Sequence, residues 1–84
     1  RETPRRPVRL LSAIEEGVPA FNGGDPERCR AIYRTALREV VNRPELTDGE
    51  QALVRGALEA AEGLDPERAA WRLRFGIDAV LAGR

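Results

Sequence analysis

The tetrapeptide Asp-Pro-Glu-Arg occurs twice in this chain of 84 residues, beginning at Asp25 and again at Asp65. An Asp carboxylate accepts hydrogen bonds from the free amide groups of a first helical turn. Pro suits the first helical position, and Glu lies favourably at the positive end of the helix dipole. Each copy therefore predicts a helix with the Asp as its N-cap. The first runs from Asp25 to about Asn42, because Pro44 prevents its continuation, and the second from Asp65 to about Ala82.

Two further helices are predicted from the rest of the chain. Thr47 and Glu50 have the spacing of a capping box, in which each side chain bonds the other residue's backbone N–H. This box opens a helix that ends at about Glu62. Residues 8–22 also have helical spacing and are followed by two glycines. Pro19 is expected to break or kink that helix, on its polar side.

Apolar residues recur at helical spacing in all four segments, which gives each predicted helix one face suited to a core. The four faces comprise Leu10, Leu11, Ile14, Val18 and Phe21; Cys29, Ile32, Tyr33, Ala36, Leu37 and Val40; Leu53, Val54, Ala57, Leu58 and Ala61; and Ala69, Leu73, Ile77, Val80 and Leu81. No segment alternates with period two, so no strand is predicted. The sequence therefore predicts one all-α domain, residues 8–84, as a four-helix up-down bundle of two hairpins, 8–42 and 47–82. Residues 1–7 are expected to form an extended, basic, Pro-rich tail or linker.

A shift of forty residues aligns the two hairpins. Gly17 then matches Ala57 and Tyr33 matches Leu73, so that small residues match small ones and large residues match large ones. This register favours a duplicated supersecondary unit. The alternative is that Asp-Pro-Glu, a common helix start, arose twice.

The segment "GVPAFNGGDPERCRAIYRTAL" resembles a tetratricopeptide hairpin. Its matching positions, in order, are Gly17, Gly24-Asp25, Cys29, Tyr33 and Ala36. The second half matches more weakly, through Ala57, Asp65, Ala69, Leu73 and Gly76. The chain departs from the pattern in its longer period, in Ala13 at the place of the early Trp, and in Pro19. The resemblance implies a scaffold that holds a peptide or a partner domain and has no chemistry of its own.

The composition limits the function classes that fit this chain. Fourteen Arg balance fourteen Asp and Glu, so there is no general attraction to nucleic acid or to an anionic membrane. No apolar run approaches membrane-spanning length, so no membrane insertion is expected. The use of Arg without Lys suggests a GC-rich bacterial genome. The chain begins with Arg, and we expect an excised or processed piece, cytoplasmic by default or secreted.

Cys29 is the only thiol, and the chain has no His to serve as its base. The favoured interpretation of Cys29 is therefore a buried packing residue. The alternative is that Cys29 and Tyr33 border a pocket in a small-ligand-binding or regulatory domain. The carboxylates of Glu15, Glu16, Glu59 and Glu62 lie on polar faces, so no metal site is predicted. No catalytic residue and no cofactor is predicted either, and the chain is expected not to be an enzyme.

Two surface features are candidate binding sites. Arg30, Arg34 and Arg38 recur every four residues and form a basic ridge, which is interpreted as a solvated face balanced by acids of a neighbour. Its alternative role is to bind phosphates or an acidic helix. Trp71, Phe75 and Ala79 follow one side of the last helix, away from its core face. Aromatic residues dominate many interface cores. We therefore expect a non-enzymatic protein-interaction or scaffold module whose partner, a protein, a peptide or a second copy, contacts these residues. The competing interpretation is that residues 1–7 or the first helix cover them.

Overall fold

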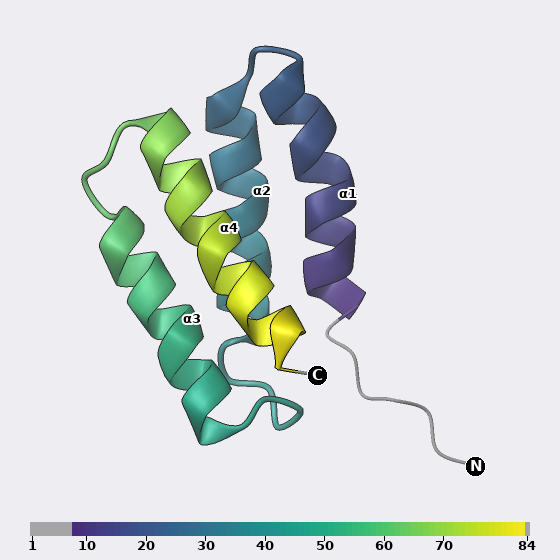
Figure 1. The fold of residues 1–84 in the computed structure, drawn as a ribbon, viewed down its shortest axis with the longest axis vertical. Coiled ribbons are helices and arrows are strands. Elements are labelled where there is room, and N and C mark those ends of the chain that lie inside the picture. Colours follow the sequence, from purple (N-terminus) through teal and green to yellow (C-terminus); the bar gives the residue numbers. More distant parts are fainter. Residues whose placement is uncertain (1–7, 84) are drawn as a thin grey trace.

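The computed structural model describes residues 8–83, and these fold into four helices without a strand (Figure 1). The helices are α1 (Val8–Asn22), α2 (Pro26–Val40), α3 (Asp48–Ala61) and α4 (Pro66–Ala82). α1 and α2 form one hairpin, α3 and α4 form the other, and both hairpin turns lie at the same end of the molecule (Figure 1). The predicted all-α, four-helix bundle is thus confirmed. The predicted tail, residues 1–7, lies outside the described residues.

The second helices of the two hairpins, α2 and α4, form the centre of the fold. α2 packs closely on both α1 and α4, whereas α3 packs mainly on α4. The outer positions are therefore occupied by α1 and α3 (Figure 1). Within residues 8–83, none of the four helices is long and apolar enough to cross a membrane.

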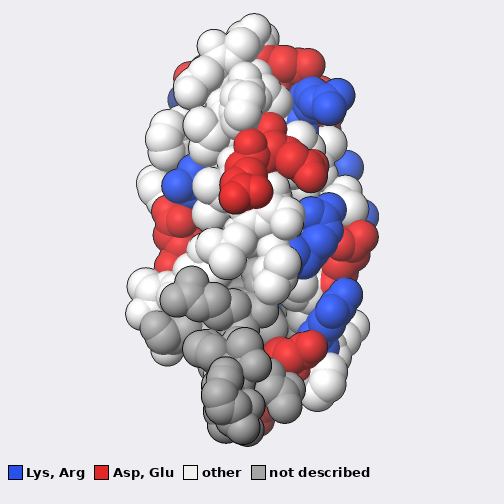
Figure 2. Space-filling view, turned by 90° about the vertical axis from the view of Figure 1, so that its right-hand side faces the viewer, with Lys and Arg blue, Asp and Glu red and all other residues white. Residues whose placement is uncertain are grey.

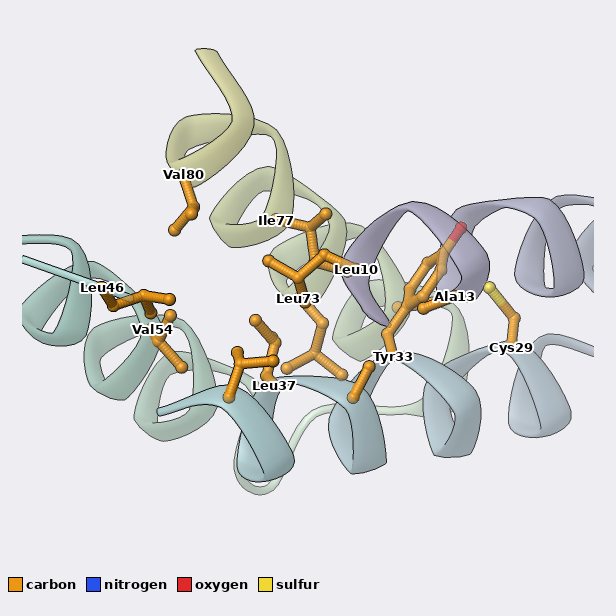
Figure 3. Close-up of a cluster of buried hydrophobic side chains, with 13 residues drawn as sticks. Leu10, Ala13, Cys29, Tyr33, Leu37, Leu46, Val54, Leu73, Ile77 and Val80 are labelled. Atoms are coloured by element: carbon orange, nitrogen blue, oxygen red, sulfur yellow. The ribbon is translucent and has the colours of Figure 1, made fainter. Parts of the chain in front are cut away.

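The core is continuous between the two hairpins. Leu37, Leu73 and Ile77 of the inner helices are fully buried, together with Leu10 of α1 (Figure 3). At the other end of the cluster, Leu46 packs near Val54 (Figure 3). Leu46 belongs to the connector between α2 and α3, and helical periodicity gave no reason to expect it in the core. The connector thus contributes to packing as well as to chain reversal.

The predicted core faces of the two outer helices need correction. α3 buries only Val54, and Leu53 is 46% exposed. α1 buries Ala13 and Gly17 besides Leu10, whereas the larger side chains of its predicted face are only partly buried. An outer helix has one main neighbour, so only a narrow stripe is shielded from water. Periodicity identified the apolar side of each helix but not the width of the contact.

Small residues let the helices of each hairpin approach closely. A methyl group added at Gly17 of α1 would overlap the ring of Tyr33 on α2, lying 2.7 Å from Cζ. In the second hairpin, a methyl group at Gly76 would overlap the side chain of Ala57. Glycine is thus required at both crossings by the space available.

The two hairpin turns differ although both lead into Asp-Pro-Glu-Arg. In the first, Gly24 has a φ of +89° and the amide of Asp25 donates to the carbonyl of Ala20 at 2.9 Å, as in a Schellman motif. In the second, the glycine with positive φ is Gly63, with a φ of +80°. Leu64 stands where the first turn has Gly24, so the left-handed residue comes one position earlier. The chain therefore enters α4 by a different path.

The two aspartates also differ in helix capping. The Asp25 carboxylate accepts a hydrogen bond from the Arg28 amide at 3.1 Å, as predicted. Asp65 occupies the N-cap position of α4, but its side chain makes no capping hydrogen bond. The prediction of two equivalent aspartate caps is wrong at Asp65.

Two other local predictions can be compared with the structure. The capping box of Thr47 and Glu50 is confirmed, because both of its reciprocal hydrogen bonds are present. α1 continues through Pro19, whose side chain is exposed as expected for the polar side. The proline therefore does not break the helix.

Candidate interaction site

A half-open pocket of about 210 Å³ lies where α1, α2 and α4 meet. Its walls are largely apolar, and each of the three helices contributes one or two residues with polar groups. The main lining residues are Val18 and Phe21 of α1, Cys29 and Tyr33 of α2, and Trp71 and Arg74 of α4. The structure thus brings the predicted pair, Cys29 and Tyr33, to a pocket wall. It also places Trp71, predicted for partner binding, at the same pocket.

A chain of polar contacts runs along this wall. Cys29 and Tyr33 extend from successive turns of α2 toward α1 (Figure 3). The Tyr33 hydroxyl lies close enough to the Cys29 thiol to affect its pKa, and Arg74 Nη1 donates to the Tyr33 oxygen at 3.5 Å. Arg74 Nε donates in turn to Asp78 Oδ1 at 3.0 Å. These contacts orient the guanidinium between the pocket and the surface of α4.

The ionisation of these groups follows from their burial. Burial raises the pKa of the Cys29 thiol, and the hydrogen bond with Tyr33 and the charge of Arg74 oppose it only in part. Burial also raises the pKa of Tyr33, and the hydrogen bond with Cys29 acts in the same direction. Because Cys29 is only 1% exposed as well, the wall presents a neutral thiol and a neutral phenol. A thiol in this state is a poor nucleophile.

Arg74 keeps its charge in this setting. Burial acts to lower its pKa, but the hydrogen bonds to Asp78 and Tyr33 outweigh that effect, and the net shift is upward. The pocket therefore has apolar walls and one guanidinium, whose charge is paired with the Asp78 carboxylate.

Three aromatic side chains form a continuous strip at the mouth of the pocket, which we call the aromatic strip: Phe21, Trp71 and Phe75. The ring centroids of Phe21 and Trp71 lie 5.8 Å apart at an interplanar angle of 70°, and those of Trp71 and Phe75 lie 6.0 Å apart. Trp71 is 49% exposed and Phe75 is 58% exposed. The first helix therefore touches Trp71 through Phe21 without covering it. Ala79, predicted to continue this strip, is also exposed.

Sequence reasoning missed Arg74 and placed Phe21 in the core. The signal for Arg74 was present, because Trp71, Arg74, Phe75 and Asp78 follow the spacing of a single helix face. For Phe21 there was no such signal. An apolar residue near the end of a helix becomes a pocket wall only when a third helix leaves space beside it.

The predicted basic ridge is partly neutralised by neighbouring acids. Arg30 forms a salt bridge with Glu27 of the same helix, and the charge of Glu62 after α3 also acts on it. Arg34 is half-buried and Arg38 is exposed. On the face that carries α1, acidic and basic side chains are interspersed, beside an uncharged area at the upper left (Figure 2). Of the ridge, Arg30 is thus paired within α2, by Glu27, and Glu62 adds an acidic charge from the other hairpin.

Within residues 8–83, no three Cys, Asp or Glu side chains are grouped closely enough to hold a metal ion. Comparisons of this chain with protein-family models, with curated proteins and with solved structures give no match.

Proposed function

We propose that this domain is a non-enzymatic protein-interaction module that binds a partner polypeptide through the aromatic strip and the pocket beside it. The observation that carries the proposal is the exposure of Trp71 and Phe75, at 49% and 58%, next to an apolar pocket. Exposed large apolar groups that adjoin one another mark interaction surfaces more often than single exposed side chains do. The resemblance to a tetratricopeptide hairpin implies a scaffold role of the same kind, and the small residues at both helix crossings agree with a duplicated unit.

The geometry of the strip suits an anchor for a partner. Aromatic side chains bury a large area with few rotatable bonds, and Trp is enriched among the residues that dominate binding energy. Trp71 is held from one side by the edge contact with Phe21. A side chain that is already oriented loses less conformational entropy when a partner covers it.

The size of the pocket distinguishes this proposal from the alternative of a small-ligand-binding domain. Pockets for whole small molecules and cofactors occupy roughly 300–1,000 Å³. The pocket beside Cys29 and Tyr33 has about 210 Å³. An apolar cavity of about 150 Å³ accommodates one benzene molecule. The pocket therefore suits one side chain of a partner better than a complete cofactor.

Site-directed photo-crosslinking tests the proposal in cells that make this protein. A benzophenone-bearing phenylalanine analogue replaces Phe75 in one variant and Leu53 in a matched control. Leu53 is also an exposed apolar side chain, at 46%, but it lies on α3 and does not line the pocket. We expect a discrete crosslinked polypeptide from position 75, none from position 53, and loss of that crosslink when Trp71→Ser is added. Mass spectrometry then shows whether the polypeptide is a second copy of this chain or another protein.

Crosslinking from neither position, or equally from both, would contradict the proposal. The melting temperature of Trp71→Ser provides the structural control. Truncating a fully buried Trp costs roughly 3–5 kcal/mol, and the half-exposed Trp71 should cost clearly less. A loss of stability in the range of a buried Trp would assign the strip to internal packing and not to partner binding.

A further inference from the structure

The outward side of α4 carries one stripe of exposed residues along most of its length. The close neighbours of α4 are α2 and α3, and α4 lies in front of α2 in the view of Figure 1. From position 68 to the end of the helix, every exposed residue has the spacing of a single helix face. We call these residues the α4 stripe: Arg68, Trp71, Arg72, Phe75, Asp78, Ala79 and Ala82.

The two halves of the α4 stripe differ in size and in charge. Its N-terminal half is large and cationic, and its C-terminal half, after Phe75, is small and anionic. A helix dipole favours the opposite order of charges. Arg68 nevertheless lies in the first turn of α4, and the last turn contains no basic residue. Within residues 8–83, Arg72 takes part in no salt bridge. The stripe therefore has charges that its own helix does not balance.

The order of these residues makes the stripe complementary to a reversed copy of itself. When two copies of α4 pair antiparallel about a two-fold axis at Phe75, positions equally far from 75 come level with each other. Trp71 then lies level with Ala79 of the second copy, whose small side chain leaves room for the indole. Arg72 lies level with Asp78 of the second copy. Arg68 comes level with the last turn of the second helix, where free carbonyl groups favour a cation.

A parallel pairing lacks this complementarity. It would place each arginine of the stripe opposite the same arginine of the second copy, and Trp71 opposite Trp71. In the antiparallel pairing, Asp78 can receive a second cation, because Arg74 Nε bonds only its Oδ1, at 3.0 Å, and the Asp78 side chain is 52% exposed. A carboxylate has two oxygens and about four acceptor sites.

We propose that the α4 stripe binds the α4 stripe of a second copy of this chain, antiparallel and with the two-fold axis at Phe75. This inference rests on the proposed function and names its partner. A stable interface buries about 800 Å² on each side, which is more than one stripe of a single helix provides. The dimer is therefore weak, with a dissociation constant between about 10 µM and 1 mM.

Sedimentation equilibrium between about 10 µM and 1 mM tests the association, since this range spans the expected dissociation constant. The mass should rise from that of one chain, 9.3 kDa, toward that of two. Phe75→Ser should keep the protein monomeric throughout, because it removes the contact on the axis. Leu53→Ser is the matched control, because Leu53 is also an exposed apolar side chain but lies on α3. It should associate as the unaltered protein does.

Charge exchange tests the antiparallel register. Arg72→Glu should weaken association at least about tenfold, because the two-fold axis turns both Arg72–Asp78 pairs into like-charged pairs. Arg72→Glu combined with Asp78→Arg restores both pairs and should recover most of the affinity. The combined variant has the same net charge of zero as the unaltered chain, so overall charge does not explain a recovery. Arg55→Glu, at an exposed arginine of α3, should leave association unchanged.

Three results would overturn the inference: a monomer mass up to about 1 mM, the upper end of the expected range, an equal loss of association in Leu53→Ser and Phe75→Ser, or no recovery in the combined charge variant. A monomer in solution together with a discrete crosslink from position 75 to another protein would overturn this inference and leave the proposed function standing. Failure of this inference and failure of the proposed function are thus separately visible.

Discussion

The two copies of Asp-Pro-Glu-Arg provide an internal comparison of helix capping. Asp25 accepts a hydrogen bond from the Arg28 amide at 3.1 Å, whereas Asp65 makes no capping bond. Replacing an N-cap Asp by Ala typically costs about 1 kcal/mol. We therefore expect Asp25→Ala to lose about 1 kcal/mol, where the sequence alone predicts equal losses at both sites.

Asp65→Ala should lose less. Asp65 interacts with Arg68 at 3.5 Å, but both side chains are more than half exposed, and such pairs contribute little. Its charge also lies near the positive end of α4, which contributes a few tenths of a kcal/mol when solvated. The expected loss is therefore below about 0.5 kcal/mol.

Urea and thermal unfolding followed by helical circular dichroism measure the difference. For a domain of this size, 1 kcal/mol corresponds to about 4–8 °C in the melting temperature, so Asp25→Ala should melt clearly below Asp65→Ala. Asp25→Asn is the control, because Asn keeps the capping acceptor and should retain most of the stability. Equal losses in the two Ala variants would refute the reasoning, as would a loss in Asp25→Asn as large as in Asp25→Ala.

Three further predictions concern packing and ionisation. Gly17→Ala should destabilise the domain by about 1–3 kcal/mol in the same unfolding assay, because the added methyl group overlaps Tyr33. Gly56 faces open space within α3, so Gly56→Ala should instead stabilise the domain by about 0.5–1 kcal/mol. Cys29 should react slowly with a thiol reagent until denaturant is added, since it is buried and its pKa is raised. Rapid labelling of the folded protein would contradict this expectation. Cys29→Ala should fold with a loss of only about 1 kcal/mol of stability. Because the pKa values of Cys29 and Tyr33 are both raised by folding, the stability that they contribute is complete below the pKa values of the unfolded chain. It should fall above about pH 8.5, by up to about 1.4 kcal/mol per pH unit for each group, and Cys29→Ala should remove the first part of that decline.

The local elements of this fold were predictable because their determinants are local. Thr47 and Glu50 satisfy each other's backbone groups within one turn, so the start of α3 needs no tertiary contact. Periodicity likewise predicted the buried residues of α2 and most of those of α4, since both inner helices are covered along a broad face. The same rule misplaced Leu53, because the width of a contact depends on how many neighbours a helix has.

The candidate site was predictable only in part. Sequence reasoning selected Trp71 and Phe75 because they lie opposite the core face of their helix, and they are exposed. It paired Cys29 with Tyr33 as a pocket wall, and both line the pocket. The pairing of Arg74 with Asp78 follows from their i,i+4 spacing, but its contact with Tyr33, 41 residues away, could not be predicted from the sequence.

The sequence by itself determined which segments form helices and which side of each helix avoids water. Proline, glycine and capping residues act over one turn, and hydrophobic periodicity acts along one helix. The tertiary structure decided which helices are central, that Leu46 enters the core from a connector, and that Asp65 does not cap although its tetrapeptide is that of Asp25. It also created the pocket. These outcomes depend on distances between segments far apart in the chain, and such distances are set by packing between helices, as where the Tyr33 ring occupies the space that Gly17 leaves open.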